Sequence, residues 1–141
     1  ENYVDTGKVL YVFREFPTPP QPLSVAGSVI ARCAGERGGA DAYFAIVSAL
    51  LKTQQTWIRS QGPRAELMKI AAQAGMDEAA FDACLQRQEF IDTINENVRT
   101  GQTRHDVNAT PTFVINGETL ALRSFDDVAP ALDAALAKKG Q

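Results

Sequence analysis

Hydrophobic residues follow two different spacings along the chain. Val9 to Phe13 and Thr112 to Ile115 are runs that do not alternate with polar positions. Such runs predict strands inside a sheet that is covered on both sides. Between the two runs, apolar residues recur every three or four positions, which predicts helices. We therefore expect an α/β fold in which a helical segment separates two parts of one sheet.

The second run should be one strand of a hairpin. Asn116-Gly117 favours the positive φ angles that a two-residue type I′ turn requires, which makes Thr119 to Leu122 the partner strand. Pro111 stands at the entrance of the run, where a residue without an N–H is tolerated. An X-Pro bond at such a tight entrance is also a place where a cis peptide would occur.

Glycine and proline divide the helical middle into five predicted helices. The first starts with a cap at Ser24 and ends in Gly35 to Gly39, and the second starts at Asp41 and covers about four turns. The other three are centred on Leu67 to Ala74, Phe81 to Leu85 with a cap near Asp77, and Phe90 to Val98 with an end near Gly101.

Both ends of the chain carry helix signals. Glu1 to Asp5 is typical of a helix tail that Thr6-Gly7 terminates, and without a starting Met we expect Glu1 to be a cut end. The last helix should start at a capping box formed by Ser124 and Asp127. Pro130 should bend that helix, or cost it a hydrogen bond, after its first turn.

Composition excludes several classes of function. A length of 141 residues suits one domain, and 45% hydrophobic and 22% charged residues are ordinary globular values. The net charge of −3 gives no reason to expect nucleic acid or an anionic membrane as a partner. Cys33, Cys84 and the single histidine, His105, lack metal-ligand spacing, so we expect no metal. Phosphate-binding and dinucleotide-binding glycine patterns are absent, and we expect no cofactor.

Two features leave alternatives open. An even cysteine count fits one disulfide in an oxidising compartment or two inert buried thiols, and composition alone slightly favours the thiols. Thiols buried on helix faces would also argue against a Cys-His hydrolase. Glu15 follows the first apolar run, where it is either a proton-handling group or, more ordinarily, a solvated strand end.

Ala109 to Gly117 resembles the cis-proline segment of the DsbA-like branch of the thioredoxin superfamily, whose members are thiol:disulfide oxidoreductases. Four further segments are similar to the same family in the same order: Tyr3 to Val9, Val12 to Pro17, Ala31 to Ala34 and Phe81 to Leu85. The resemblance implies one domain, residues 1–141, with a thioredoxin-like fold. Residues 23–104 would be an inserted helical subdomain, and residues 1–22 and 105–141 the thioredoxin core. The family's Cys-X-X-Cys pair and the strand before it would precede Glu1.

The resemblance implies that the parent protein forms or isomerises disulfides in exported proteins, in the bacterial periplasm or cell envelope. Thr110 and Pro111 would bind substrate beside a cis peptide, and residues 1–141 would hold no catalytic residue. Partners would be unfolded or reduced exported proteins and a membrane or soluble redox partner. The alternatives are a redox-inactive binding or chaperone module, and a glutathione-dependent isomerase or transferase on the same fold.

The resemblance also implies how the two cysteines pair and how the two apolar runs are arranged in the sheet. It favours a structural disulfide between Cys33 and Cys84, since both lie on apolar faces of separate predicted helices and some relatives carry an additional disulfide. A strand outside the chain should lie between Val9 to Phe13 and Thr112 to Ile115, which would then stand roughly 9–10 Å apart and not pair directly. Unpaired buried backbone groups cost ~1–3 kcal/mol each, so the segment should not fold stably unless a strand fills that position.

Overall fold

The chain divides into two compact units in the computed structural model, which describes residues 2–121 and 124–139. Residues 15–98 form one unit, called the helical unit below, and residues 1–14 with 99–141 form the other, the hairpin unit. No helix within the described ranges has the length and apolar character needed to cross a membrane. Each unit is built by its own local sequence signals.

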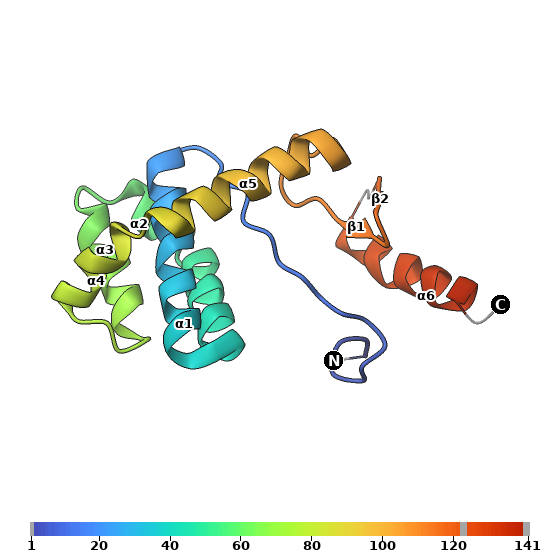
Figure 1. Ribbon diagram of the computed structural model, residues 1–141, viewed down its shortest axis with the longest axis horizontal. Helices are drawn as coiled ribbons and strands as arrows, with labels where there is room; N and C mark the ends of the chain where they lie inside the picture. Colours follow the sequence, from blue (N-terminus) through green and yellow to red (C-terminus); the bar gives the residue numbers. More distant parts are fainter. Residues whose placement is uncertain (1, 122–123, 140–141) are drawn as a thin grey trace. The chain divides into compact units, whose positions relative to one another are not determined.

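Helix α1 (Gln21–Lys52) is a helical hairpin, because two glycines break its regular backbone near the middle. Gly39 has φ +72°, a conformation that side chains disfavour, and Gly38 is also non-helical. The two halves pack closely and lie side by side in Figure 1. A Cβ atom at Gly27 would lie 3.2 Å from Leu50, and one at Gly35 would lie 3.3 Å from Tyr43. The predicted break at Gly35 to Gly39 is therefore confirmed.

The start of α1 differs from the prediction. Ser24 is not its cap, because the helix already begins at Gln21 and places Pro22 in its first turn, where a missing N–H costs nothing. The Ser24 hydroxyl instead donates to the carbonyl of Thr18 at 2.7 Å. The second half ends at Lys52, so the expected four-turn helix is divided, and Gln54–Arg59 forms a separate helix, α2.

Three further helices complete the helical unit: α3 (Pro63–Ala72), α4 (Glu78–Leu85) and α5 (Gln88–His105), the last of which continues into the hairpin unit. Asp77 caps α4 as predicted, accepting a hydrogen bond from the Ala80 amide at 2.8 Å. Gly101 does not end α5, which continues to His105. A single glycine only weakens a helix that other residues support.

The buried core belongs to the helical unit. Its largest fully buried side chains are Val29, Ile30, Ile46, Phe81 and Ile94. They come from both halves of α1 and from α4 and α5, so the core holds the helical hairpin against the shorter helices.

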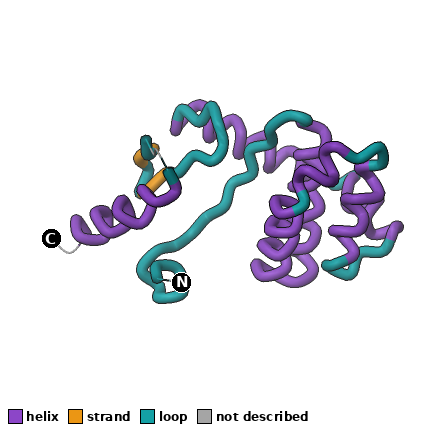
Figure 2. Tube along the Cα trace, turned by 180° about the vertical axis from the view of Figure 1, so that it is seen from behind, coloured by secondary structure: helices purple, strands orange, loops and turns teal. Residues whose placement is uncertain are grey.

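The hairpin unit contains a small antiparallel sheet, orange in Figure 2. Strand β1 (Val114–Ile115) pairs with β2 (Glu118–Thr119), with Val114 opposite Thr119. Asn116 and Gly117 have φ of 51° and 89°, which confirms the turn prediction. The strands are shorter than expected, and Leu122 lies outside the described residues. Val114 is 38% exposed, so the expectation of burial on both faces is wrong.

The first apolar run also departs from its prediction. Residues 9–13 form no strand, and Leu10 is 87% exposed. A strand is stabilised by a partner, and the only sheet in the part of the chain that the structure describes is β1–β2. Val9 to Phe13 therefore has no ladder with Thr112 to Ile115, as predicted. Residues 3–8 form turns rather than the expected helix tail.

The last part of the chain is capped as expected. Ser124 and Asp127 form a reciprocal capping box at a short 3-10 turn, η1 (Phe125–Asp127), which leads into α6 (Val128–Lys139). Because of the extra turn, Pro130 lies within the first turn of α6 and not after it. The lack of an N–H is tolerated there, since the first N–H groups of a helix have no acceptor within the helix. The Tyr3 hydroxyl donates to Asp133 of this helix at 2.9 Å, which fixes the first residues on the same unit.

Candidate functional site

The segment between α5 and β1 presents Thr110 and Pro111 on the surface. Its first residues turn sharply: Asp106 has φ 52°, and the Val107 amide bonds back to Gly101 at 3.0 Å. Figure 2 shows the segment as a loop that enters the small sheet. The Thr110–Pro111 peptide bond is cis, as the sequence predicts. Both side chains are exposed.

Contacts on each side fix this segment and leave Thr110 open. The Thr112 hydroxyl donates to the carbonyl of Ala109 at 2.7 Å, and the Leu120 amide donates to the carbonyl of Phe113 at 2.9 Å. The ring of Phe113 packs edge-on against the ring of Phe125, with 6.0 Å between the ring centroids. No hydrogen bond joins the backbone of Thr110 to another of the residues that the structure describes. The residues on both sides of the Thr110–Pro111 peptide are therefore held by contacts within the hairpin unit.

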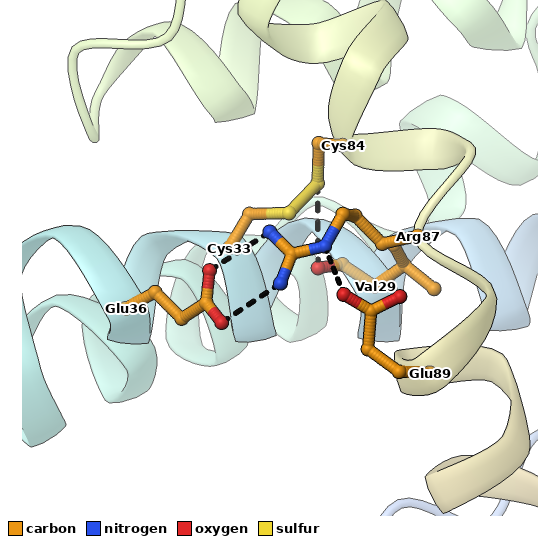
Figure 3. The surroundings of a disulfide bond; sticks show 6 residues. All are labelled: Val29, Cys33, Glu36, Cys84, Arg87 and Glu89. Carbon is orange, nitrogen blue, oxygen red and sulfur yellow. Dashed lines mark hydrogen bonds and ion pairs between the residues drawn. A yellow bond between two sulfur atoms is a disulfide. The ribbon is translucent and has the colours of Figure 1, made fainter.

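The two cysteines form a disulfide within the helical unit. The sulfur atoms of Cys33 in α1 and Cys84 in α4 are 2.07 Å apart, and the Cα atoms are 6.1 Å apart, which confirms the predicted pairing. Both residues are buried, with exposures of 6% and 4%. The Cys84 sulfur lies 3.5 Å from the carbonyl oxygen of Val29 (Figure 3), a contact without a hydrogen bond because an oxidised sulfur has no proton. No free thiol remains in residues 1–141.

An ion-pair cluster lies beside the disulfide and is called the Arg87 clasp below: Glu36, Arg87 and Glu89 (Figure 3). The guanidinium of Arg87 donates two hydrogen bonds of 2.9 Å to Glu36 and a third, from Nε, to Glu89. It also stacks over the ring of Phe90, 4.4 Å from the centroid. Bidentate pairing of this kind fixes both position and orientation.

Proton affinities follow from these contacts. The pKa of Glu89 is lowered from its ordinary value, first because Arg87 donates a hydrogen bond to its carboxylate. The hydrogen bonds to Glu36, and next to Glu89, raise the pKa of Arg87. The clasp combines two carboxylates with one guanidinium, so its formal net charge is negative.

A second charged cluster occupies the interior of the helical unit, around Glu15. The Glu15 side chain is 3% exposed and accepts from Arg32 at 2.8 Å, from Tyr43 at 2.8 Å and from Asn97 at 2.7 Å. The expectation of a solvated strand end is wrong, since Glu15 is buried and residues 9–13 form no strand. The alternative, a proton-handling group, stays a prediction. The Glu15 carboxylate joins the segment before α1, both halves of α1, and α5.

The two pairs of predicted site residues lie in different units. Thr110 and Pro111 belong to the hairpin unit, while Cys33 and Cys84 belong to the helical unit. Within the described ranges, no three His, Cys, Asp or Glu side chains are grouped as metal ligands would be.

Sequence reasoning missed both charged clusters, although one left a signal. Glu36 stands three residues after Cys33, and Arg87 stands three residues after Cys84. If the two bridged segments run in the same direction from the disulfide, opposite charges three residues beyond each cysteine come close enough to form an ion pair, because residues three apart on a helix are neighbours. The Glu15 cluster had no comparable signal, because Asn97 is 82 positions away from Glu15.

Comparisons with known proteins agree over nearly the whole chain. The family model described as "Thioredoxin" matches residues 1–134. A protein of Rickettsia typhi, named "Putative protein-disulfide oxidoreductase", is 29% identical over 136 residues, which are 96% of this chain and 48% of that protein. The protein of Rickettsia felis with the same description is also 29% identical, over 96% of this chain and 47% of its own length. The chain therefore spans about half the length of the curated relatives it matches.

A solved structure has the same fold. The crystal structure of a protein-disulfide isomerase from Novosphingobium aromaticivorans matches 96% of this chain and 78% of its own chain, with a TM-score of 0.67 and 19% identity. The predicted fold class, thioredoxin-like with a helical insertion, is confirmed by this match and by the family model.

Proposed function

The chain belongs to the thioredoxin family, and from this premise we propose that the protein is a thiol:disulfide oxidoreductase. The observation that carries the proposal is the match to protein-disulfide oxidoreductases over 96% of the chain. The reaction begins when a thiolate attacks a disulfide sulfur and forms a mixed disulfide, which a second thiol resolves. Both cysteines of residues 1–141 are held in a buried disulfide, so we assign the attacking thiolate to a cysteine outside these residues.

Thr110 and Pro111 would hold the substrate during this exchange. The unengaged backbone N–H and C=O of Thr110 suit pairing with an extended peptide, as in the addition of a strand. Such pairing recognises backbone rather than side chains, so it suits an enzyme that acts on many unfolded sequences. The Thr110 side chain would then lie beside the exchanging sulfurs and influence how the mixed disulfide resolves.

Exported proteins with reduced or incorrectly paired cysteines are the substrates we propose, in the periplasm or cell envelope, with a membrane or soluble redox partner. The disulfide of Cys33 and Cys84 supports this location, because structural disulfides persist in oxidising compartments.

The test is an exchange assay on the full-length protein, with a reduced two-cysteine peptide as substrate. We expect catalysed disulfide formation or exchange, and a several-fold change in its rate in a Thr110→Val variant. The matched control is Thr103→Val, on the exposed surface of α5, which should leave the rate unchanged. A full-length protein that binds the peptide without exchanging thiols would refute the proposal and favour a redox-inactive binding module.

A further inference from the structure

The Arg87 clasp joins the same two segments that the disulfide joins. Glu36 lies one helical turn beyond Cys33 on α1, and residues three apart on a helix are neighbours, with ~5–6 Å between Cβ atoms. Arg87 lies three residues beyond Cys84, and its amide donates to the Cys84 carbonyl at 3.0 Å, which continues the helical turn past the end of α4. The ion pair therefore links the same two segments as the disulfide, about one helical turn away from it.

The clasp lies on the solvent side of the disulfide. Its side chains are 37% exposed at Arg87, 51% at Glu36 and 58% at Glu89, whereas Cys33 and Cys84 are almost completely buried. Figure 3 shows the guanidinium between the carboxylates of Glu36 and Glu89, in the surroundings of the disulfide. Stacking on Phe90 further restrains Arg87. A molecule approaching the disulfide from this side meets the clasp first.

Exchange at this disulfide would need a thiolate to reach one sulfur. The attacking sulfur would form a new S–S bond, the Cys33–Cys84 bond would break, and the released cysteine would leave as a thiolate. The clasp has to open for that approach, and its net negative charge repels the approaching anion.

We propose that Glu36, Arg87 and Glu89 form a lid over the Cys33–Cys84 disulfide that slows attack by thiols, anionic thiols most of all. The lid keeps this bond closed in the presence of free thiols and thiol-bearing proteins. The lid depends only on contacts within the helical unit. The proposal of a lid can therefore be tested independently of the proposed oxidoreductase activity.

The test is the rate at which Cys33 and Cys84 become reduced in the full-length protein, followed by alkylation and peptide mass spectrometry. Three ethanethiols of different charge serve as probes: anionic 2-mercaptoethanesulfonate, neutral 2-mercaptoethanol and cationic cysteamine. Each variant is compared with the unchanged protein for the same thiol, so the intrinsic reactivity of each thiol cancels. The unfolding equilibrium of every variant is measured in parallel.

The variants Glu36→Gln and Arg87→Met should open the lid with opposite effects on charge. Loss of an exposed ion pair should raise the rate with the neutral thiol by about 3-fold in Glu36→Gln, and by more in Arg87→Met, which loses both partners. The rise should be largest for the anionic thiol in Glu36→Gln and for the cationic thiol in Arg87→Met. Glu66→Gln, which breaks an exposed pair with Lys69 on α3, is the matched control and should change nothing.

Two results would overturn the proposal. One is a set of rates in Glu36→Gln and Arg87→Met equal to those of Glu66→Gln for all three thiols. The other is a rise that is the same for all three thiols and proportional to the unfolding constant of the variant, since reduction would then require unfolding rather than opening of the lid.

Discussion

Replacing Glu15 with alanine should destabilise the helical unit far more than the removal of a surface charge from it. Glu15 is 4% exposed and accepts hydrogen bonds from three side chains, among them the guanidinium of Arg32. Without the carboxylate, Arg32 keeps a mostly buried positive charge without its anionic partner, and Tyr43 and Asn97 lose their acceptor.

The magnitude follows from which groups are left unpaired. Breaking a buried ion pair by removing one partner costs ~3–5 kcal/mol, compared with ~1–3 kcal/mol for one neutral buried group. Arg32 retains 21% exposure, so part of its charge remains solvated and the lower half of the first range applies. We expect a loss of about 3–4 kcal/mol in Glu15→Ala. Glu15→Gln keeps one acceptor oxygen and should cost about half as much, because charge-assisted hydrogen bonds are roughly twice as strong as neutral ones.

The assay is urea unfolding of the full-length protein, with hydrogen exchange at the amides of α1 and α5 to localise the effect. Glu66→Ala removes a partly exposed carboxylate, paired with the exposed Lys69, from the same unit and should cost less than ~1 kcal/mol. A loss in Glu15→Ala within ~1 kcal/mol of the loss in Glu66→Ala, or amides of α1 and α5 that exchange no faster, would show that the Glu15 carboxylate is not a buried partner of Arg32.

Three further results are expected. Replacing both Cys33 and Cys84 by alanine should cost about 4 kcal/mol, as chain entropy predicts for a separation of 51 residues, and an unchanged urea midpoint would contradict that. Because the folded pKa of Glu89 is depressed, its contribution to stability is complete above its ordinary value of 4.5 and is lost as the pH falls through the folded pKa. When the free energy of unfolding is measured as a function of pH in acid, the loss that comes from Glu89 should therefore be smaller in Arg87→Met. The same dependence on pH in Arg87→Met and in the unchanged protein would contradict this prediction. Gly39→Ala places a side chain at φ +72° and should cost ~1–3 kcal/mol in thermal unfolding, whereas no change would mean that the kink adapts.

Features that depend on neighbouring residues could be predicted from the sequence. The Asn116-Gly117 turn, the Asp77 cap and the glycine break in α1 all follow from backbone preferences of one or two residues. Thr110–Pro111 required the family resemblance in addition, because the local sequence only permits a cis bond. The disulfide likewise depended on the family, since the spacing of two cysteines does not determine whether they pair.

Features that depend on distant partners could not be predicted in this way. Val9 to Phe13 has the composition of a buried strand, but a strand requires a neighbour, and residues 9–13 have none in the described sheet. The burial of Glu15 depends on donors from Arg32, Tyr43 and Asn97, which only the packing of α1 against α5 brings together. A charged residue next to a proline-rich segment is ordinarily exposed, so composition indicated the wrong environment.

The most direct test of the proposed chemistry is to trap the mixed disulfide. The full-length protein is mixed with a peptide that carries one cysteine activated as a disulfide, quenched with acid, and mapped by mass spectrometry. We predict that the peptide becomes attached to a cysteine other than Cys33 and Cys84, while those two remain bonded to each other. Attachment at Cys33 or Cys84, or opening of the bond between them, would contradict an oxidoreductase in which that disulfide is structural.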